Sequence, residues 1–385
     1  MLIALLHILT ALAAIVTIAS IAYCLFCART GVQFARQQNR VAEAALPPVS
    51  MLKPLKGSDP ELYDALRSHC LQDYPEFEIL FAVSDASDAA VAVVERLICE
   101  FPARKLRLIR CESRMGVNGK VSSLAQLVQH AAYQIFLVND SDIRVGADYL
   151  RRVIAKLQQP TIGLVTCLYR GIPSSTVPSR LEALGISTDF VPGVLVARRI
   201  EGRLRFGLGS TLAFRKRDLE GIGGFETILD YLADDYELGR RIAERNLQVE
   251  LSECVVETHL PAYDFSLFFS HQLRWARTIR ASRLAGYRGL LFTFTLPWAL
   301  LDLLLAGGAI WAWWLFVAAV LARFAMATVS SQLVLRDKPA LGSFWLLPLR
   351  DFLAPVIWMG GLIGRKIRWR GESFILEDDG KLRPS

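Results

Sequence analysis

The feature that most constrains this chain is that its apolar residues are gathered in blocks at the two ends. Leu2 to Phe26 is almost uncharged and is long enough to span a bilayer. No small-residue cleavage site follows it, which predicts a retained anchor rather than a removed signal peptide. Arg29, Arg36 and Arg40 come next. Because positive residues stay cytoplasmic, we expect the chain from residue 29 onward to face the cytosol.

A second apolar block occupies the C-terminal part of the chain. Its three membrane candidates run from Leu290 to Leu305, from Ala309 to Val334 and from Phe344 to Ile363. Two groups of basic residues compete for the cytoplasmic side, Arg336 with Lys338 inside the block and Arg365 through Arg370 after it. They cannot both be cytoplasmic if all three segments span, so one segment can lie in the interface instead, and the side of the C-terminus stays open. Charges at membrane depth are costly, and we expect them to face protein, headgroups or a cavity: Asp302, Arg323, Arg350 and Asp351.

Composition points to a membrane surface as the charged partner. Hydrophobic residues make up 53% of the 385-residue chain, charged residues only 21%, and the formal net charge is +7. The basic residues stand beside apolar segments and form no long stripe, which favours an anionic bilayer over nucleic acid. Of the seven cysteines, Cys24 and Cys27 lie inside the first apolar segment, and the others are typical of reduced thiols in a cytosolic domain.

Between the two apolar blocks, short apolar runs alternate with helical stretches. Val49 to Leu52, Glu78 to Val83 and Leu106 to Ile109 are predicted strands. Glu61 to Leu71 is a predicted helix, with Asp59 or Ser58 as its cap. Strands that alternate with helices at this spacing predict an α/β fold with a largely parallel sheet.

An Asp-x-Asp sequence follows the strand predicted for Tyr133 to Val138. Asp140 and Asp142 stand just past the strand end, where open α/β sheets bind ligands. Two carboxylates at this spacing can converge on one hard cation that also holds a substrate diphosphate. The alternative is an Asp-rich turn that caps the next helix, near Asp148.

Three further stretches carry features that an active site can use. Gly207 to Phe214 is a predicted strand entered through glycines, where backbone can approach a ligand closely. Asp234 and Asp235 open a predicted helix that ends near Arg245 and Asn246. Acidic residues at the start of a helix can also serve as its N-terminal cap. Phe265 to Arg283 combines aromatic residues with arginines at a three-residue step, which is typical of an interfacial amphipathic helix.

Six short motifs follow one another along the chain: Lys53-Pro54-Leu55-Lys56-Gly57, Val83-Ser84-Asp85, Asn118-Gly119-Lys120, Asn139-Asp140-Ser141-Asp142, Asp234-Asp235-Tyr236 and His271-Gln272-Leu273-Arg274-Trp275. In this order they resemble the ceramide glucosyltransferase family of inverting membrane glycosyltransferases (glycosyltransferase family 21). The similarity is greatest to the bacterial branch that includes the glycosyltransferase of hopanoid biosynthesis. It covers nearly the whole chain, and it implies a glycosyltransferase-A fold, a UDP-sugar donor and a membrane lipid acceptor.

The resemblance implies a division of the chain into six parts. An N-terminal transmembrane anchor (1–28) and a linker (29–48) precede a cytosolic catalytic domain (49–260). An interfacial helix with the His-x-x-Arg-Trp motif (261–288), two or three C-terminal membrane helices (289–364) and a tail (365–385) follow. For a bacterial source, this arrangement implies an inner-membrane enzyme with its active site in the cytosol.

The resemblance also implies a role for each motif residue that binds the donor. Asp85 is expected to contact the uracil or ribose, although an Asp turn is the alternative there. Lys120 is expected to reach uridine or phosphate, and Lys53 and Lys56 to flank the nucleotide. Asp140 and Asp142 are expected to hold Mg²⁺ or Mn²⁺ against the diphosphate.

The last two motifs imply the general base and the groups around the leaving diphosphate. Inversion needs one carboxylate to take the acceptor proton, and the resemblance assigns that role to Asp235. Arg274 is expected to bind the leaving diphosphate, and Trp275 to pack near sugar or acceptor. His271 departs from the family pattern, which has Gln or Arg in that position, but its ring can still hydrogen-bond a phosphate or hydroxyl.

The function expected from these residues is transfer of a hexose, N-acetylglucosamine or glucose, from a UDP-sugar to a membrane lipid hydroxyl. Hopanoid polyol and ceramide are the expected acceptors. A processive polysaccharide synthase is an alternative, but it needs more membrane spans than this chain offers. A non-catalytic scaffold or transporter is a second alternative, and it predicts that the acidic motif residues are lost, whereas all are present.

Overall fold

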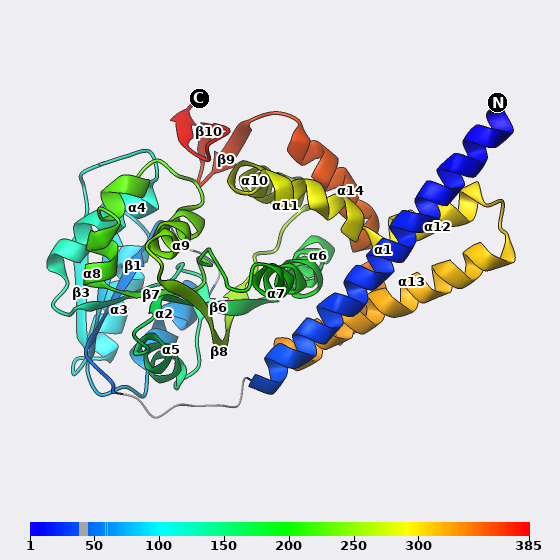
Figure 1. Cartoon of the computed structure of the whole chain (residues 1–385). Coiled ribbons are helices and arrows are strands. Elements are labelled where there is room, and N and C mark those ends of the chain that lie inside the picture. Colours follow the sequence, from blue (N-terminus) through cyan, green and yellow to red (C-terminus); the bar gives the residue numbers. More distant parts are fainter. Residues whose placement is uncertain (38–44, 58, 60) are drawn as a thin grey trace. The chain divides into compact units, whose positions relative to one another are not determined.

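The computed structural model describes residues 1–37, 45–57, 59 and 61–385, and within it the chain forms two compact units. A helical unit comprises Met1–Gln37, Ser175–Arg199 and Ala262–Gly364, and a sheet unit comprises the described residues of Gln38–Ser174 with Ile200–Pro261 and Arg365–Ser385 (Figure 1). Each unit is therefore built from three stretches of sequence. The predicted catalytic domain 49–260 is interrupted, because 175–199 belong to the helical unit.

The sheet unit is organised around one mixed sheet with the strand order β3-β2-β1-β4-β7-β6-β8-β5. Strands β3, β2, β1 and β4 are parallel, β7 runs antiparallel to both its neighbours, and β6 pairs in parallel with β8. The strands are β1 (Val49–Pro54), β2 (Phe77–Val83), β3 (Lys105–Arg110), β4 (Ile135–Val138), β5 (Ile143–Arg144), β6 (Ile162–Ile172), β7 (Leu212–Arg215) and β8 (Gln248–His259).

The central strands form where the sequence predicted them, because they are short apolar runs. Every residue of β2 and of β4 is buried, as expected for strands covered on both faces. The helices of this unit cover the sheet with their apolar faces, and Leu66, Val94 and Ile154 enter the core. They are α2 (Leu62–Cys70), α3 (Ala90–Glu100), α4 (Gly119–Leu127), α5 (Tyr149–Leu157), α8 (Lys216–Gly221) and α9 (Asp234–Glu244).

The stretch 365–385, predicted to be a tail, forms a three-stranded antiparallel sheet. Its strands are β9 (Lys366–Trp369), β10 (Glu372–Leu376) and β11 (Leu382–Pro384), in the order β11-β10-β9. It joins the rest of the sheet unit through backbone hydrogen bonds: Leu382 N–H donates to Asp230 and Leu232 N–H donates to Gly380. This C-terminal sheet is therefore an integral part of the sheet unit.

The helical unit contains the apolar segments of both chain ends. Helix α1 spans Leu2–Gln37, so residues 29–37 of the predicted linker are helical, and 38–44 lie outside the described residues. It packs against α12 (Thr295–Leu305) and α13 (Ile310–Thr328), which also pack against each other (Figure 1). This unit also contains α6 (Val177–Gly185), α7 (Val191–Ile200), α10 (Phe265–Ser282), α11 (Leu284–Gly289) and α14 (Leu347–Leu362).

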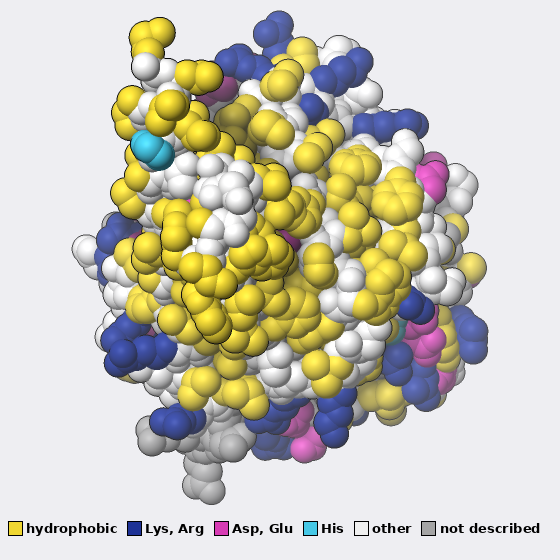
Figure 2. All heavy atoms as spheres, turned by 90° about the vertical axis from the view of Figure 1, so that its right-hand side faces the viewer, with side chains coloured by type: hydrophobic (Ala, Val, Ile, Leu, Met, Phe, Trp, Pro, Cys, Tyr) yellow, Lys and Arg dark blue, Asp and Glu magenta, His cyan; other side chains and the backbone are white. Residues whose placement is uncertain are grey.

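Several helices are long and apolar enough to cross a membrane. Three qualify by length and composition, Leu2–Gln37, Ile310–Val334 and Lys338–Leu362. A fourth candidate is the pair Leu284–Thr293 and Thr295–Leu305, which is bent by 51° where the sequence predicted one segment. Figure 2 looks onto the side where α1, α12 and α13 lie in Figure 1, and hydrophobic side chains cover most of that face of the helical unit.

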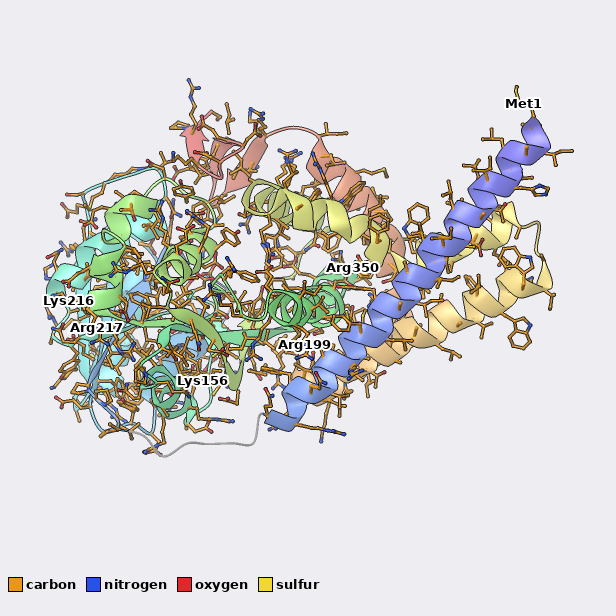
Figure 3. The ribbon with its side chains drawn as sticks, in the orientation of Figure 1. Met1, Lys156, Arg199, Lys216, Arg217 and Arg350 are labelled. Carbon is orange, nitrogen blue, oxygen red and sulfur yellow. The ribbon has the colours of Figure 1, made fainter. Side chains whose placement is uncertain are left out.

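The charges inside the apolar helices are paired in the interior of the helical unit, with one exception. Arg323 of α13 is 3% exposed and donates to both carboxylate oxygens of Asp351 on α14, at 2.7 to 3.0 Å. It also donates to Asp189, which accepts a further hydrogen bond from Arg350 (labelled in Figure 3). Asp302 is fully buried, and its carboxylate has no hydrogen-bond partner among the described residues.

Two arginines of the predicted interfacial helix cap a neighbouring helix. Arg280 donates to the carbonyls of Gly361 and Leu362 at 2.8 Å, and Arg277 donates to that of Ile363 at 3.0 Å. These carbonyls close α14, where terminal C=O groups lack partners within the helix. The three-residue arginine step therefore stabilises a helix end within the helical unit, a role that the sequence did not predict.

Candidate active site

The loop after β4 is fixed by a buried asparagine. The Asn139 amide donates to the Tyr149 hydroxyl at 2.8 Å and to the Ser210 carbonyl at 2.7 Å. Both partners come from other elements, so the loop is tied to α5 and to the stretch before β7. Asp148, at the N-cap position of α5, makes no capping hydrogen bond with its side chain. The Asp-x-Asp residues thus stand directly past a strand end on an anchored loop.

Lys120 connects two acidic loops of the sheet unit. Its ammonium lies 2.8 Å from Asp140 Oδ1 and 2.9 Å from Asp234 Oδ2. The position is set at the start of α4, where Asn118 caps the helix by accepting from the Val121 N–H. Burial lowers the pKa of Lys120, but the charges of the surrounding carboxylates outweigh it and raise the pKa above its ordinary value.

Gly209 lies between the carboxylates of Asp140 and Asp235. The Gly209 N–H donates to Asp235 Oδ2 at 2.7 Å, and its carbonyl accepts from the Asp140 N–H at 3.2 Å. A Cβ on Gly209 would lie 2.7 Å from Asp140 Oδ2 and 3.5 Å from Asp235 Oδ2. Two acidic groups separated by almost a hundred residues therefore meet at one glycine, which has no side chain to keep them apart.

Asp235 is held in place by two backbone N–H donors. Besides the bond from Gly209, its Oδ1 accepts from the Tyr236 N–H at 2.8 Å. Burial, followed by the neighbouring carboxylate of Asp234, raises the pKa of Asp235 to about 6. A carboxylate in this state is a better proton acceptor near neutral pH than an exposed aspartate.

Asp142 completes the acidic cluster. It accepts a hydrogen bond from the Thr258 hydroxyl of β8. Burial and the charge of Asp140 raise the pKa of Asp142 to about 6. A divalent cation between Asp140 and Asp142 would offset this repulsion, so the two carboxylates fit one. No group of three or more His, Cys, Asp or Glu side chains that could hold a metal occurs among the described residues.

Lys53 and its partner His69 lie in the interior of the sheet unit. Lys53 is fully buried at the end of β1, with its amine 2.9 Å from His69 Nε2. Burial lowers the pKa of Lys53 to about 7, although Asp140 and Asp142 act to raise it. His69 is also fully buried, and burial together with the Lys53 charge depresses its pKa. Lys53 thus acts on the acidic cluster through its charge and has no exposed surface for the predicted nucleotide contact.

The structure does not bring Asp85 or Lys56 into hydrogen-bond contact with the acidic cluster. Asp85 is exposed past β2, where its Oδ1 accepts from the Ser87 N–H and hydroxyl, both at 2.8 Å. These hydrogen bonds from Ser87 lower the pKa of Asp85. Lys56 is exposed and pairs with Glu372 of the C-terminal sheet at 2.9 Å.

The three residues of the His-x-x-Arg-Trp motif belong to α10 of the helical unit. His271 Nδ1 lies 2.9 Å from Oε1 of the buried Glu182 on α6. The ring of Trp275 contacts that of His271, with 5.2 Å between centroids, and that of Phe190, with 6.2 Å. Arg274 is half-buried on the same helix. Within the sheet unit, the structure brings together four of the predicted site residues, Lys120, Asp140, Asp142 and Asp235.

Sequence analysis missed Arg370, which lies beside the Asp-x-Asp loop. Its guanidinium donates to both oxygens of Asp59, at 2.7 and 3.1 Å, and to Ser141 Oγ at 3.4 Å. Ser141 in turn donates to Asp59. Asp59, predicted to cap α2, makes no side-chain hydrogen bond to that helix among the described residues. No pattern in 365–385 indicated this contact, because the segment has neither strong periodicity nor a recognised motif.

The fold is that of a glycosyltransferase. The mannosyltransferase PcManGT from Pyrobaculum calidifontis, solved in complex with GDP-Man and Mn²⁺, superposes with a TM-score of 0.56 at 20% sequence identity. The match covers 92% of this chain and 97% of that one. Together with the strand order, this likeness confirms the predicted glycosyltransferase-A fold, a mostly parallel sheet flanked by helices, with apolar helices at both chain ends.

Residues 9–382 match the model of glycosyl transferase family 21, and the chain belongs to that family. It is 24% identical over 370 residues to ceramide glucosyltransferase 3 of Caenorhabditis elegans, covering 91% of this chain and 77% of the worm protein. It is 32% identical over 121 residues to the ceramide glucosyltransferase of Candida albicans, which covers 28% of this chain and 22% of the fungal protein. The predicted family is therefore confirmed, and the protein is a glycosyltransferase.

Proposed function

We propose that this enzyme transfers a hexose, glucose or N-acetylglucosamine, from a UDP-sugar to a hydroxyl group of a membrane lipid, with inversion. The observation that carries the proposal is the meeting of Asp140 and Asp235 at Gly209, with Lys120 bound to Asp140. This meeting supports a role for Asp140 in holding a cation on the donor and a role for Asp235 in accepting a proton from the acceptor.

The donor side of the proposal rests on the loop after β4. Asp140 and Asp142 would hold Mg²⁺ or Mn²⁺, and the bound cation would neutralise charge on the departing diphosphate. Lys120 is proposed to release Asp140 and turn toward phosphate or uridine, and Asp85 to bind the base or ribose. The mannosyltransferase of the same fold was solved with a nucleotide sugar and Mn²⁺, which supports this use of the site.

The acceptor side assigns the proton to Asp235. Inversion is one in-line displacement: the acceptor oxygen forms a bond to the anomeric carbon while the bond from that carbon to the diphosphate oxygen breaks. The diphosphate leaves with the electron pair, and the acceptor hydroxyl gives its proton to Asp235. A pKa raised to about 6 suits this role, because the group is ionised at neutral pH yet basic enough to take the proton.

A lipid acceptor is supported by the relatives and by the apolar helices. The worm and fungal relatives are ceramide glucosyltransferases, and three or four segments of this chain are long and apolar enough to cross a bilayer. Ceramide and a hopanoid polyol are the acceptors we propose. Arg274, Trp275 and His271 are proposed to act near the leaving diphosphate and the acceptor, and the sheet unit to face the cytosol of a bacterial inner membrane.

Product analysis tests the substrates directly. The full chain, in membranes, is supplied with ceramide or a hopanoid polyol and with carbon-13-labelled UDP-glucose or UDP-N-acetylglucosamine. Mass spectrometry of the extracted lipids is expected to show a labelled glycolipid for one pairing of donor and acceptor. Labelled polysaccharide in place of glycolipid, or no transfer to any lipid alcohol, contradicts the proposal.

Replacement of the proposed base tests the chemistry. Asp235→Asn should lower turnover by about 10² to 10⁴-fold, because the amide cannot take the acceptor proton, while UDP binding persists. The rate is measured from labelled lipid formed per enzyme, and UDP binding by calorimetry. Asp148→Asn, in the exposed turn before α5, serves as the matched control and should leave the rate unchanged. Near-normal turnover by Asp235→Asn would remove Asp235 as the base.

A further inference from the structure

The C-terminal sheet carries an arginine in a backbone conformation that arginine rarely adopts. Trp369 pairs with Glu372 across the β9–β10 hairpin, which leaves Arg370 and Gly371 as the two turn residues. Both have positive φ, 49° and 84°, as the central residues of a type I′ turn require. Asn, Asp and Gly are favoured in such a turn, and an arginine there costs about 1–2 kcal/mol of backbone strain.

The strained turn places the Arg370 side chain against the Asp-x-Asp loop. Its two donor nitrogens bind the two carboxylate oxygens of Asp59, and one of them also lies 3.4 Å from Ser141 Oγ. Ser141 stands between Asp140 and Asp142, which are the proposed cation ligands. Burial acts to lower the pKa of Arg370, but the hydrogen bonds and charge of Asp59, followed by the charges of these two carboxylates, outweigh it and raise the pKa. A residue in a costly conformation beside an acidic loop is a candidate for function.

The rest of the hairpin is fastened to loops on either side of that position. Glu372 pairs with Lys56 after β1 at 2.9 Å and with Arg114, before α4, at 3.0 Å. The backbone of β11 bonds to Asp230, and the side chain of Asp230 accepts from the Val117 N–H at 2.9 Å. These contacts connect the hairpin to the loops that follow β1 and β3, and Arg370 itself contacts the loop that follows β4.

We propose that Arg370 binds the diphosphate of the sugar nucleotide, exchanging Asp59 and Ser141 for phosphate oxygens when the donor is bound. This inference rests on the proposed function, since it needs a nucleoside diphosphate at the Asp-x-Asp loop. A guanidinium fork matches two phosphate oxygens as well as it matches a carboxylate, and such paired, charge-assisted bonds are strong. In the donor-free protein, Asp59 holds the same fork in place.

The ligand series that tests the proposal separates phosphate from nucleoside. UDP, GDP, UMP and uridine are titrated into the full chain in detergent with Mg²⁺, and binding is measured by calorimetry. The wild type is expected to bind UDP. Arg370→Ala should weaken UDP binding tenfold or more, and uridine binding by less than twofold, because only the diphosphate loses a partner. Arg370→Lys should recover part of the loss, since lysine keeps the charge without the fork.

Two variants control for damage to the sheet. Arg368→Ala removes an exposed arginine two residues away on β9 and should bind UDP as the wild type does. Arg370→Asn places a residue suited to positive φ in the turn, so it should melt close to the wild-type temperature while losing UDP affinity as Arg370→Ala does. UDP affinity within twofold of wild type in Arg370→Asn would overturn the inference.

Failure of the proposed function gives a different pattern. If the wild type binds neither UDP nor GDP, a nucleoside diphosphate is not the ligand, and both proposals fall together. If the wild type binds GDP but not UDP, the proposed donor is wrong. In that case, weaker GDP binding by Arg370→Ala supports the role of Arg370, and unchanged GDP binding contradicts it.

Discussion

Gly209 is the residue at which the two halves of the proposed reaction come together. Its backbone donates to Asp235 and accepts from Asp140, and both carboxylates approach the space that a side chain would fill. The sequence indicated that backbone near Gly207 to Phe214 approaches a ligand. In the structure, the glycine makes room for two acidic side chains of the protein itself.

Adding one methyl group at Gly209 should therefore impair transfer more than folding. The Cβ of Gly209→Ala would lie 2.7 Å from Asp140 Oδ2, closer than carbon and oxygen normally approach, so the carboxylate must move. A misplacement of about 1 Å in an active site can cost about 10²-fold in rate, and we expect a loss of that order. Turnover and melting temperature are measured together. Gly193→Ala, where an added Cβ meets nothing within 4 Å, is the control and should be as active as wild type.

The raised pKa of Asp235 predicts an acid limb in the rate profile. Burial is the main cause, followed by the charge of Asp234, and the value is about 6. Asp235 has to be ionised to take the acceptor proton, so protonation below pH 6 should lower the rate. Initial rates at saturating donor are measured from pH 5 to pH 8. A rate that stays flat down to pH 5 would contradict the proposed role.

Among the elements, the strands of the main sheet were predictable and the C-terminal sheet was not. Strand β2 is an unbroken apolar run, and such a run has few alternatives to a buried strand. In β9 and β10, buried residues such as Ile367 and Phe374 are separated by charged or exposed ones over only four or five residues. Runs this short carry little periodic signal, and the positive φ of Arg370 has no marker in the sequence.

The same contrast holds for the site residues. Asp140 and Asp142 were predicted from their place just past a strand end, and Lys120 and Asp235 were predicted because their motifs match a known family. The burial of Lys53 on His69 and the contact of Arg370 with Asp59 depend on distant segments that meet only in the folded chain. Tertiary packing decides these contacts, and local sequence does not.

A buried ion pair between Arg323 and Asp351 joins α13 and α14, and breaking it should lower the stability of the protein. Asp351→Leu would leave the Arg323 charge without its main partner, and breaking a buried pair in this way typically costs about 3–5 kcal/mol. We expect a lower melting temperature and a poor yield of folded protein in detergent, measured by size-exclusion chromatography. Asp378→Leu, which removes an exposed pair with Arg365, should have little effect.

The double variant Arg323→Leu/Asp351→Leu makes this prediction specific. Removing both charges eliminates the unpaired guanidinium, and buried pairs can often be replaced by apolar residues at little cost. The double variant should therefore be more stable than Asp351→Leu alone, although Asp189 loses a partner in it. A double variant that is less stable than the single one would show that the pair itself, and not the unpaired charge, determines the stability.

The chain as a whole combines a helical unit that has large apolar side chains on its surface with a sheet unit that has them in its interior. The helical unit exposes large apolar side chains such as Ile18, Trp314 and Ile363, as a membrane protein does. The sheet unit buries its apolar residues and gathers charged groups in the loops that follow its strands. The net charge of +7 favours an anionic surface as a partner, and this stays a prediction from composition.

Removal of divalent cations should stop the whole enzyme without unfolding it. Asp140 and Asp142 are two carboxylates close together. Among the described residues, the side chains that contact them are Lys120, which pairs with Asp140, and Thr258, which donates to Asp142. EDTA is expected to abolish transfer, and Mg²⁺ or Mn²⁺ to restore it, as followed by labelled lipid formed. The melting temperature should change little. Full activity in metal-free buffer would contradict a cation at this site.

The interleaving of the two units has a consequence for how the enzyme is made. Residues 365–385 leave the ribosome only after every apolar helix of the chain has been synthesised. If Arg370 binds the donor and the apolar helices insert into a membrane, as proposed, a nascent chain is unable to bind sugar nucleotide tightly until those helices have left the ribosome and entered the membrane.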